Sequence, residues 1–88
     1  MFFVYILQSM MNNLYYIGIT DNIDRRLAEH NAGKSKYTSK VLPFKRVFLQ
    51  GYESRLIARN MEVWLKKQKS RKLIEKILID GKINKIVI

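Results

Sequence analysis

The chain has 88 residues, with 17 Lys or Arg against 7 Asp or Glu, and so a formal net charge of +10 at neutral pH. This length supports one small domain, and a hydrophobic fraction of 48% is enough for a compact core and too high for a disordered tail. The absence of cysteine excludes a disulfide scaffold, a zinc–thiolate site and a cysteine nucleophile.

The sequence predicts neither a membrane span nor a signal peptide. Its longest apolar run, residues 1–7, is too short to cross a bilayer and lacks a charged flank and a small-residue cleavage site. We therefore expect a soluble protein in the reducing cytoplasm. The basic excess predicts a polyanionic partner, with nucleic acid first and an acidic membrane surface or an acidic protein as alternatives.

The first twenty residues carry no charged side chain and predict a β-hairpin. Residues 2–7 are aromatic and β-branched without alternation, which is typical of a strand covered on both faces. Residues 14–20 form the second predicted strand. Asn12 and Asn13 between the strands suit a tight turn, because Asn tolerates positive φ.

The rest of the chain predicts three helices and a third strand. A helix over residues 22–32 begins at Asp21 or Asn22 and ends before Gly33, and a polar basic loop follows it. The later elements are a strand over 44–52, a helix from Ser54 to about Lys69, a helix from Ser70 to Gly81, and a weak strand or tail over 82–88. The order ββαβαα predicts one α+β domain over residues 1–88, a three-stranded antiparallel sheet flanked by helices.

Helical spacing supplies the first candidate site residues. Ile23, Leu27 and His30 fall on one stripe of the helix over 22–32, and Arg26 borders that stripe. An arginine there needs an anionic partner, since an unpaired charge beside the core is unfavourable. The alternative is structural: Arg26 extends past the core to solvent, and His30 packs as a hydrogen-bonded core histidine.

Four further residues stand out in the strands and the next long helix. Glu62 lies at the edge of an apolar stripe, where it alternatively forms an ordinary i,i+4 ion pair with Lys66. Tyr5 and Tyr16 lie eleven residues apart across the hairpin, a spacing that can make them cross-strand neighbours, although tyrosine also simply fits a half-buried strand. Gly18 interrupts a strand of large residues, which often marks a close approach by another backbone or a ligand.

Together these residues form an ordered set. The triplets Phe3-Val4-Tyr5 and Tyr16-Ile17-Gly18 are followed by Arg26, by His30 four residues later, and by Glu62 in the next long helix. The set resembles the GIY-YIG nuclease domain, and most closely its small stand-alone bacterial members. The resemblance covers roughly residues 2–75 and extends to the segment 16–34, to Lys36-Tyr37-Thr38, to Pro43 and to the segment 62–67. One departure is Phe3, which stands where the family's first triplet has Gly and which bears on strand geometry rather than on a reacting group.

The resemblance implies an endonuclease that hydrolyses or nicks DNA with one divalent metal ion, Mg²⁺ or alternatively Mn²⁺, in DNA repair or recombination. RNA remains an alternative substrate. The resemblance implies that Tyr5 takes the proton from the attacking water, with Tyr16 holding or sharing that role. It also implies that Arg26 neutralises charge on the scissile phosphate, that His30 helps to position or protonate groups near it, and that Glu62 holds the metal ion. Gly18 has an implied structural role.

The acidic residues agree with a single metal ion. No Asp-x-Asp or Glu-x-Lys cluster is present, which disfavours a two-metal nuclease. One Mg²⁺ held by Glu62, waters and the substrate phosphate fits, because this ion commonly uses one or two carboxylates and keeps waters. A tyrosine ordinarily has a pKa of about 10, so a tyrosine base needs activation by the metal or by nearby cations.

Two basic stretches predict how nucleic acid is held. The first covers residues 34–46 and contains no acid, and the second covers residues 66–76. The predicted contacts are Lys34, Lys36, Tyr37 as a stacking ring, Thr38, Lys66 and Lys67. The alternative for each lysine is a solvated surface, and two alternatives to a nuclease stay open: a non-cutting binding module of the same fold, and a small basic partner domain in a complex.

Overall fold

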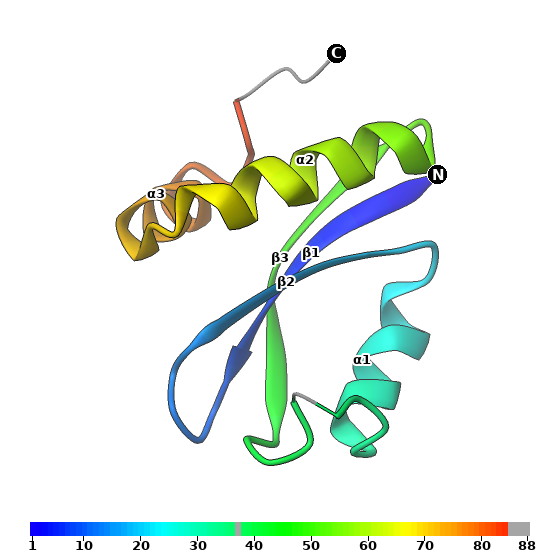
Figure 1. Cartoon of the computed structure of the whole chain (residues 1–88), viewed down its shortest axis with the longest axis vertical. Helices are drawn as coiled ribbons and strands as arrows, with labels where there is room; N and C mark the ends of the chain where they lie inside the picture. Colours follow the sequence, from blue (N-terminus) through cyan, green and yellow to red (C-terminus); the bar gives the residue numbers. More distant parts are fainter. Residues whose placement is uncertain (37, 85–88) are drawn as a thin grey trace.

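The fold is built on a three-stranded antiparallel sheet in the order β2–β1–β3 (Figure 1). The computed structural model describes residues 1–36 and 38–84. The strands are β1 (Phe2–Ser9), β2 (Tyr15–Thr20) and β3 (Phe44–Tyr52). Residues 4–7 of the central strand β1 are all buried, because both faces of the sheet are covered. The uninterrupted apolar run at the start of the sequence correctly predicted a strand covered on both faces.

Three capped helices complete the order ββαβαα, which confirms the predicted α+β class. They are α1 (Ile23–Asn31), α2 (Arg55–Gln68) and α3 (Arg71–Asp80). Asn22, Ser54 and Ser70 are their N-caps, and each side chain accepts a hydrogen bond from the backbone N–H three residues later. Such bonds satisfy donors that a helix start otherwise leaves free, so the caps predicted from sequence fix where the helices begin.

The two faces of the sheet carry different helices (Figure 1). Val4 and Ile6 pack against apolar side chains of α2 and α3, in one core cluster. Tyr5 and Leu7 point to the other face, where side chains of α1 and of the loop before β3 cover them. Alternation along β1 therefore sends Tyr5 to the α1 side of the sheet.

The β1–β2 hairpin has a register that differs from the cross-strand pairing suggested for the two tyrosines. Tyr5 pairs with Gly18, and Tyr16 pairs with Leu7. The cause is the turn, in which Asn13 adopts a φ of 61° and the Ser9 N–H bonds the Leu14 carbonyl. Tyr16 is therefore a diagonal neighbour of Tyr5, on the same face but two residues before Gly18 on β2.

Phe3 leaves the geometry of β1 intact. It pairs with Thr20 on β2 and with Gly51 on β3, within a strand that runs unbroken from Phe2 to Ser9. A Cβ at Gly51 would lie 3.2 Å from the Phe3 ring, so the glycine opposite leaves room for the bulky residue. The departure from the first triplet thus does not interrupt the strand that carries Tyr5.

The chain after α3 packs against β3. Gly81 ends α3 with a φ of 76°, and the buried Ile83 donates its backbone N–H to Gln50 Oε1 at 2.8 Å. Residues 82–84 form no strand, and the rest of the predicted tail, 85–88, lies outside the described residues. None of the described helices has the length and apolar character that a membrane crossing requires.

Candidate active site

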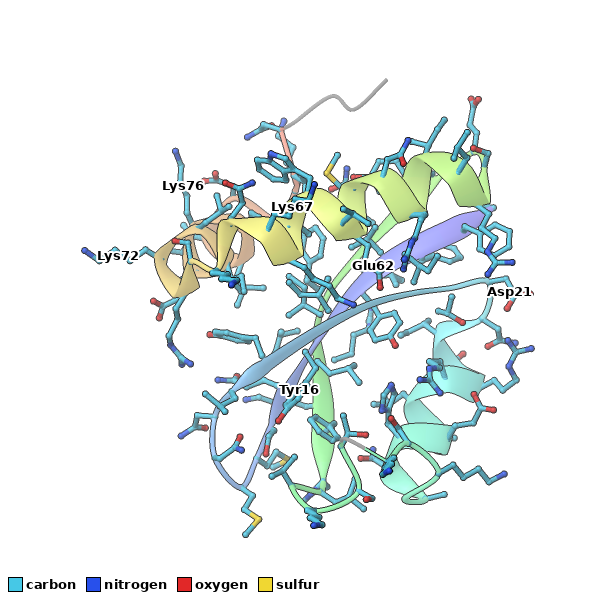
Figure 2. All side chains as sticks on the ribbon, in the orientation of Figure 1. Tyr16, Asp21, Glu62, Lys67, Lys72 and Lys76 are labelled. Carbon is cyan, nitrogen blue, oxygen red and sulfur yellow. The ribbon has the colours of Figure 1, made fainter. Side chains whose placement is uncertain are left out.

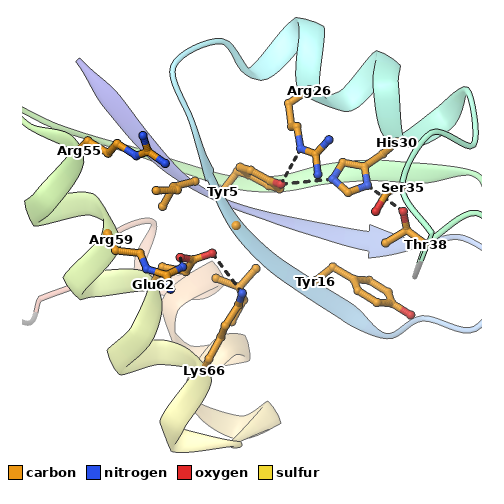
Figure 3. Close-up of a pocket in the computed structure, with 13 residues that line it drawn as sticks. Tyr5, Tyr16, Arg26, His30, Ser35, Thr38, Arg55, Arg59, Glu62 and Lys66 are labelled. Atoms are coloured by element: carbon orange, nitrogen blue, oxygen red, sulfur yellow. Dashed lines mark hydrogen bonds and ion pairs between the residues drawn. The ribbon is translucent and has the colours of Figure 1, made fainter.

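A cleft of about 670 Å³ opens beside the edge strand β2, between α1 and α2 (Figure 3). The five residues predicted to carry the chemistry all line it: Tyr5, Tyr16, Arg26, His30 and Glu62. They come from both sides of the sheet, because α1 covers one face and α2 the other. The cleft therefore brings together two groups of side chains that meet around the edge of the sheet.

On the α1 side, the Tyr5 hydroxyl is the centre of a hydrogen-bond chain (Figure 3). It lies 3.2 Å from His30 Nε2 and accepts a hydrogen bond from Arg26 Nε at 3.3 Å. Tyr5 and His30 are both buried, whereas about a third of the Arg26 side chain is exposed to the cleft and solvent. The spacing of Arg26 and His30 on α1 thus places both groups on one phenol oxygen.

His30 is held from its other nitrogen by Thr38. The distance from His30 Nδ1 to Thr38 Oγ1 is 2.8 Å, and the Thr38 side chain is almost completely buried. Thr38 also lines the cleft, so its contact with nucleic acid stays a prediction, while its hydroxyl bonds the imidazole. The loop after α1 thus contributes a residue that orients His30.

His30 is neutral at neutral pH. Burial, and then the positive charge of Arg26, lower the pKa of His30 below its ordinary value of 6.5, and the carboxylate of Glu29 partly opposes them. A neutral imidazole has one N–H donor and one acceptor nitrogen. When Nδ1–H donates to Thr38, Nε2 is free to accept the hydroxyl proton of Tyr5, and the opposite tautomer reverses both bonds.

Gly18 permits the position of Tyr5. The two residues are directly paired across β1 and β2. A Cβ at residue 18 would lie 2.5 Å from Cζ of the Tyr5 ring, much closer than carbon atoms can approach. A close approach at this glycine is present as expected, but the approaching group is a side chain, the Tyr5 phenol, and not the backbone or ligand that the sequence suggested.

On the α2 side, the carboxylate of Glu62 lines the cleft. Its side chain is 6% exposed, and its two oxygens bind different cations: Oε1 accepts from Arg59 Nη1 at 2.8 Å and Oε2 from Lys66 Nζ at 3.1 Å. Figure 2 shows Glu62 below α2 on the side facing the sheet, whereas Lys72 and Lys76 extend outward from α3. The predicted ion pair with Lys66 is present, and it coexists with a position in the cleft.

Two arginines of the cleft were missed in the sequence. Arg55 and Arg59 line it from α2, beside Glu62 and Lys66. The four residues follow one another at steps of four, three and four, which places them on one face of a helix. The three-residue spacing from Arg59 to Glu62, which is typical of an ion pair on a helix, was the signal in the sequence that could have indicated Arg59.

Some of the residues predicted to contact nucleic acid lie at the cleft and others lie outside it. Lys34 and Lys36 are exposed and flank Ser35, which lines the cleft. Lys66 lines the cleft itself, whereas Lys67 is exposed on α2 outside the lining. Tyr37, the predicted stacking ring, lies outside the described residues.

The donor set of the cleft fits a hard divalent cation with few protein ligands. In the part of the chain that the structure describes, no group of three or more His, Cys, Asp or Glu could hold a metal ion. Among the described residues that line the cleft, Glu62 is the one carboxylate. A single carboxylate is compatible with a hard divalent cation, because such an ion commonly takes one or two carboxylates and completes its shell with water and phosphate oxygens.

Comparison with known proteins identifies the family of this fold and site. Residues 1–76 match the family described as the GIY-YIG catalytic domain. The chain belongs to the GIY-YIG family. This membership supports hydrolase activity of the nuclease type, with nucleic acid as the substrate.

Similar sequences occur in several bacteria. A UPF0213 protein of Streptococcus pneumoniae serotype 4 is 43% identical over 68 residues, covering 76% of this chain and 68% of the relative. A UPF0213 protein of Lactococcus lactis subsp. cremoris is 38% identical over 85 residues, covering 91% and 86%. The solution NMR structure of a UPF0213 protein from Bacillus halodurans is similar in fold, with a TM-score of 0.57, 32% identity and coverage of 92% and 87%.

Proposed function

We propose that this GIY-YIG domain is a metal-dependent endonuclease that hydrolyses phosphodiester bonds in DNA. The observation that carries the proposal is the Tyr5 hydroxyl, held between Arg26 and a neutral His30 in a cleft that also contains Glu62. Phosphodiester hydrolysis requires a proton acceptor for water, positive charge at the non-bridging oxygens and a stabilised leaving group. The cleft offers Tyr5 as the proton acceptor and Arg26, together with a cation on Glu62, as positive charge.

Tyr5 is the general base in this proposal. Its hydroxyl gives its proton to His30 Nε2 and takes up a proton from the attacking water, while Arg26 stabilises the oxygen when it is negatively charged. Tyr16 lines the same cleft, but its ring packs edge-to-face against Phe44 with centroids 5.1 Å apart. Among the described residues, Tyr5 is the tyrosine whose hydroxyl is hydrogen-bonded to both a histidine and an arginine, so we assign proton transfer to Tyr5 and water positioning to Tyr16.

Glu62 would hold the divalent cation, which supplies positive charge at the scissile phosphate when it is bound. The basic residues near the cleft bind the flanking phosphates. Lys34 and Lys36 lie on the loop after α1, and Lys66 and Lys67 lie on α2. Contacts of this kind bind nucleic acid in a salt-dependent manner with little sequence preference.

One observation favours a second function. Both oxygens of Glu62 are occupied by Arg59 and Lys66, so the acid is neutralised by the protein itself. A domain that only binds nucleic acid could use such an arrangement to present basic groups without cutting. Cleavage by the purified protein distinguishes the two functions.

The test is nicking of supercoiled plasmid with Mg²⁺ by the wild-type chain and by Tyr5→Phe and Glu62→Gln variants. We expect Tyr5→Phe to lose activity by about a hundredfold or more, because general base catalysis contributes at least that much. Glu62→Gln should also lose activity, because the amide no longer holds the divalent cation. Tyr52→Phe is the matched control, since Tyr52 bonds Gln50 on β3 and does not line the cleft. Salt-sensitive DNA binding without nicking by the wild type would establish the binding module instead.

A further inference from the structure

The buried acid Glu62 and its two cations differ in their exposure to solvent. The Glu62 side chain is 6% exposed, whereas Arg59 is 61% and Lys66 is 53% exposed. An exposed cation gains little from an ion pair, because water solvates it well on its own. A buried carboxylate without a partner is strongly unfavourable. Glu62 therefore needs a cation at all times, whereas Arg59 and Lys66 can leave once another cation replaces them.

A divalent cation that binds Glu62 is repelled by the two positively charged side chains already on its oxygens, and this repulsion favours displacement of at least one of them. The displaced side chain then has no other acid in the cleft, because Glu62 is the one carboxylate among the described lining residues. Arg55 lies on the same face of α2, one turn before Arg59, and adds its charge to the same region. A side chain displaced from Glu62 therefore leaves uncompensated positive charge in the cleft, which repels the metal ion and attracts an anion.

We propose that Arg59 and Lys66 form an exchange pair. In the free protein they hold Glu62, and in the nucleic-acid complex they bind backbone phosphates while a divalent cation takes their place on Glu62. This inference rests on the proposed function for the identity of the two ligands. Arg59 suits the second role because a guanidinium binds phosphate oxygens in a bidentate manner, and both side chains already line the cleft.

Cooperative binding is the consequence. The phosphate draws Arg59 and Lys66 away from Glu62 and so frees the acid for the cation, and the cation frees both side chains for the phosphate. By thermodynamic linkage, each ligand raises the affinity for the other by the same factor. The free protein accordingly has a weak metal site, which becomes strong when nucleic acid is present.

The test measures Mn²⁺ affinity by calorimetry, with and without a short DNA duplex, in a Tyr5→Phe background that prevents cutting. We expect the duplex to raise Mn²⁺ affinity by at least about fivefold, the lower end of typical coupling between sites. Arg59→Gln and Lys66→Gln should each raise Mn²⁺ affinity in the absence of DNA and reduce the effect of the duplex. Arg25→Gln is the matched control, because Arg25 pairs with Asp21 on an exposed part of α1 outside the cleft.

The outcomes separate this inference from the nuclease proposal. Mn²⁺ affinity that the duplex does not change, or that falls in both α2 variants, overturns the exchange pair even if the wild type nicks plasmid. Coupling without nicking by the wild type supports the exchange pair and overturns the nuclease. A change of equal size in Arg25→Gln would show a general charge effect and would also overturn the exchange pair.

Discussion

Gly18 lies directly opposite Tyr5 across β1 and β2, and a Cβ at this glycine would lie 2.5 Å from Cζ of the tyrosine ring. The phenol therefore occupies the space that any other residue at position 18 would fill. Its hydroxyl reaches His30 and Arg26 from this position. The glycine of the second triplet thus acts through packing on the tyrosine of the first.

We predict that Gly18→Ala displaces the Tyr5 ring. Inserting a methyl group into a filled site costs about 1–3 kcal/mol of stability, which denaturant unfolding measures. Plasmid nicking should fall together with it, because the hydroxyl moves away from His30. A double-mutant cycle checks the cause: in a Tyr5→Ala background, the same Gly18→Ala change should cost much less. Equal costs in the two backgrounds would show that the ring is not what the methyl group meets.

Thr38→Val should disturb His30 without removing it. Valine has nearly the same shape as threonine but cannot bond His30 Nδ1, which leaves a buried nitrogen unsatisfied at a cost of about 1–3 kcal/mol. Since the tautomer of His30 is then no longer fixed, we expect the pH profile of nicking to shift, and not only the yield of folded protein. Thr38→Ser should restore the profile. A profile identical to that of the wild type in the valine variant would contradict an orienting role.

His30 should make the protein less stable in acid. Folding lowers the pKa of His30 below 6.5, so the unfolded chain binds the proton more readily than the folded chain. The contribution of His30 to the free energy of unfolding is therefore fully present above about pH 6.5. It is lost as the pH falls through the lowered pKa that His30 has in the folded protein. Urea unfolding between about pH 8 and about pH 5 should show this loss, with a smaller loss in His30→Gln. An equal loss in both proteins would assign the acid sensitivity to other groups.

The loop lysines should bind phosphates. Lys36→Gln should reduce the slope of log affinity against log salt by about one ion, since each phosphate contact releases close to one counterion. Filter binding of a DNA duplex over a salt series measures the slope. Lys82→Gln is the control, because Lys82 is exposed beyond α3 and does not line the cleft. An unchanged slope in Lys36→Gln would identify Lys36 as a solvated surface residue.

The features that the sequence predicted correctly depend on local signals. The N-caps Asn22, Ser54 and Ser70 and the apolar run of β1 fixed the elements and their order. The hairpin register did not follow, because turn length rather than tyrosine spacing determines which residues pair. The role of Thr38 could not be predicted either, since the loop after α1 turns inward only when His30 and the sheet are in place.

Glu62 shows how a site residue can be predicted only in part. Its spacing from Lys66 predicted one ion pair, and its place at the edge of an apolar stripe agreed with burial. The second pair, with Arg59, obeys the same helical rule on the other side of the acid. Glu62 and Tyr5 lie on opposite sides of the sheet and meet at the cleft beside β2. This opposition is a tertiary relationship, which no local sequence pattern encodes.

That opposition has a further consequence for how the enzyme can be tuned. Tyr5 and Glu62 belong to different layers of the protein, and the edge strand β2 is the part of the sheet that lies between them at the cleft. As an edge strand, β2 is hydrogen-bonded to a neighbouring strand on one side alone. The position of β2 therefore shapes the opening of the cleft between Tyr5 and Glu62. We expect a change in the β1–β2 turn to shift β2 and so to alter the shape of the cleft, even when Tyr5 and Glu62 are unchanged.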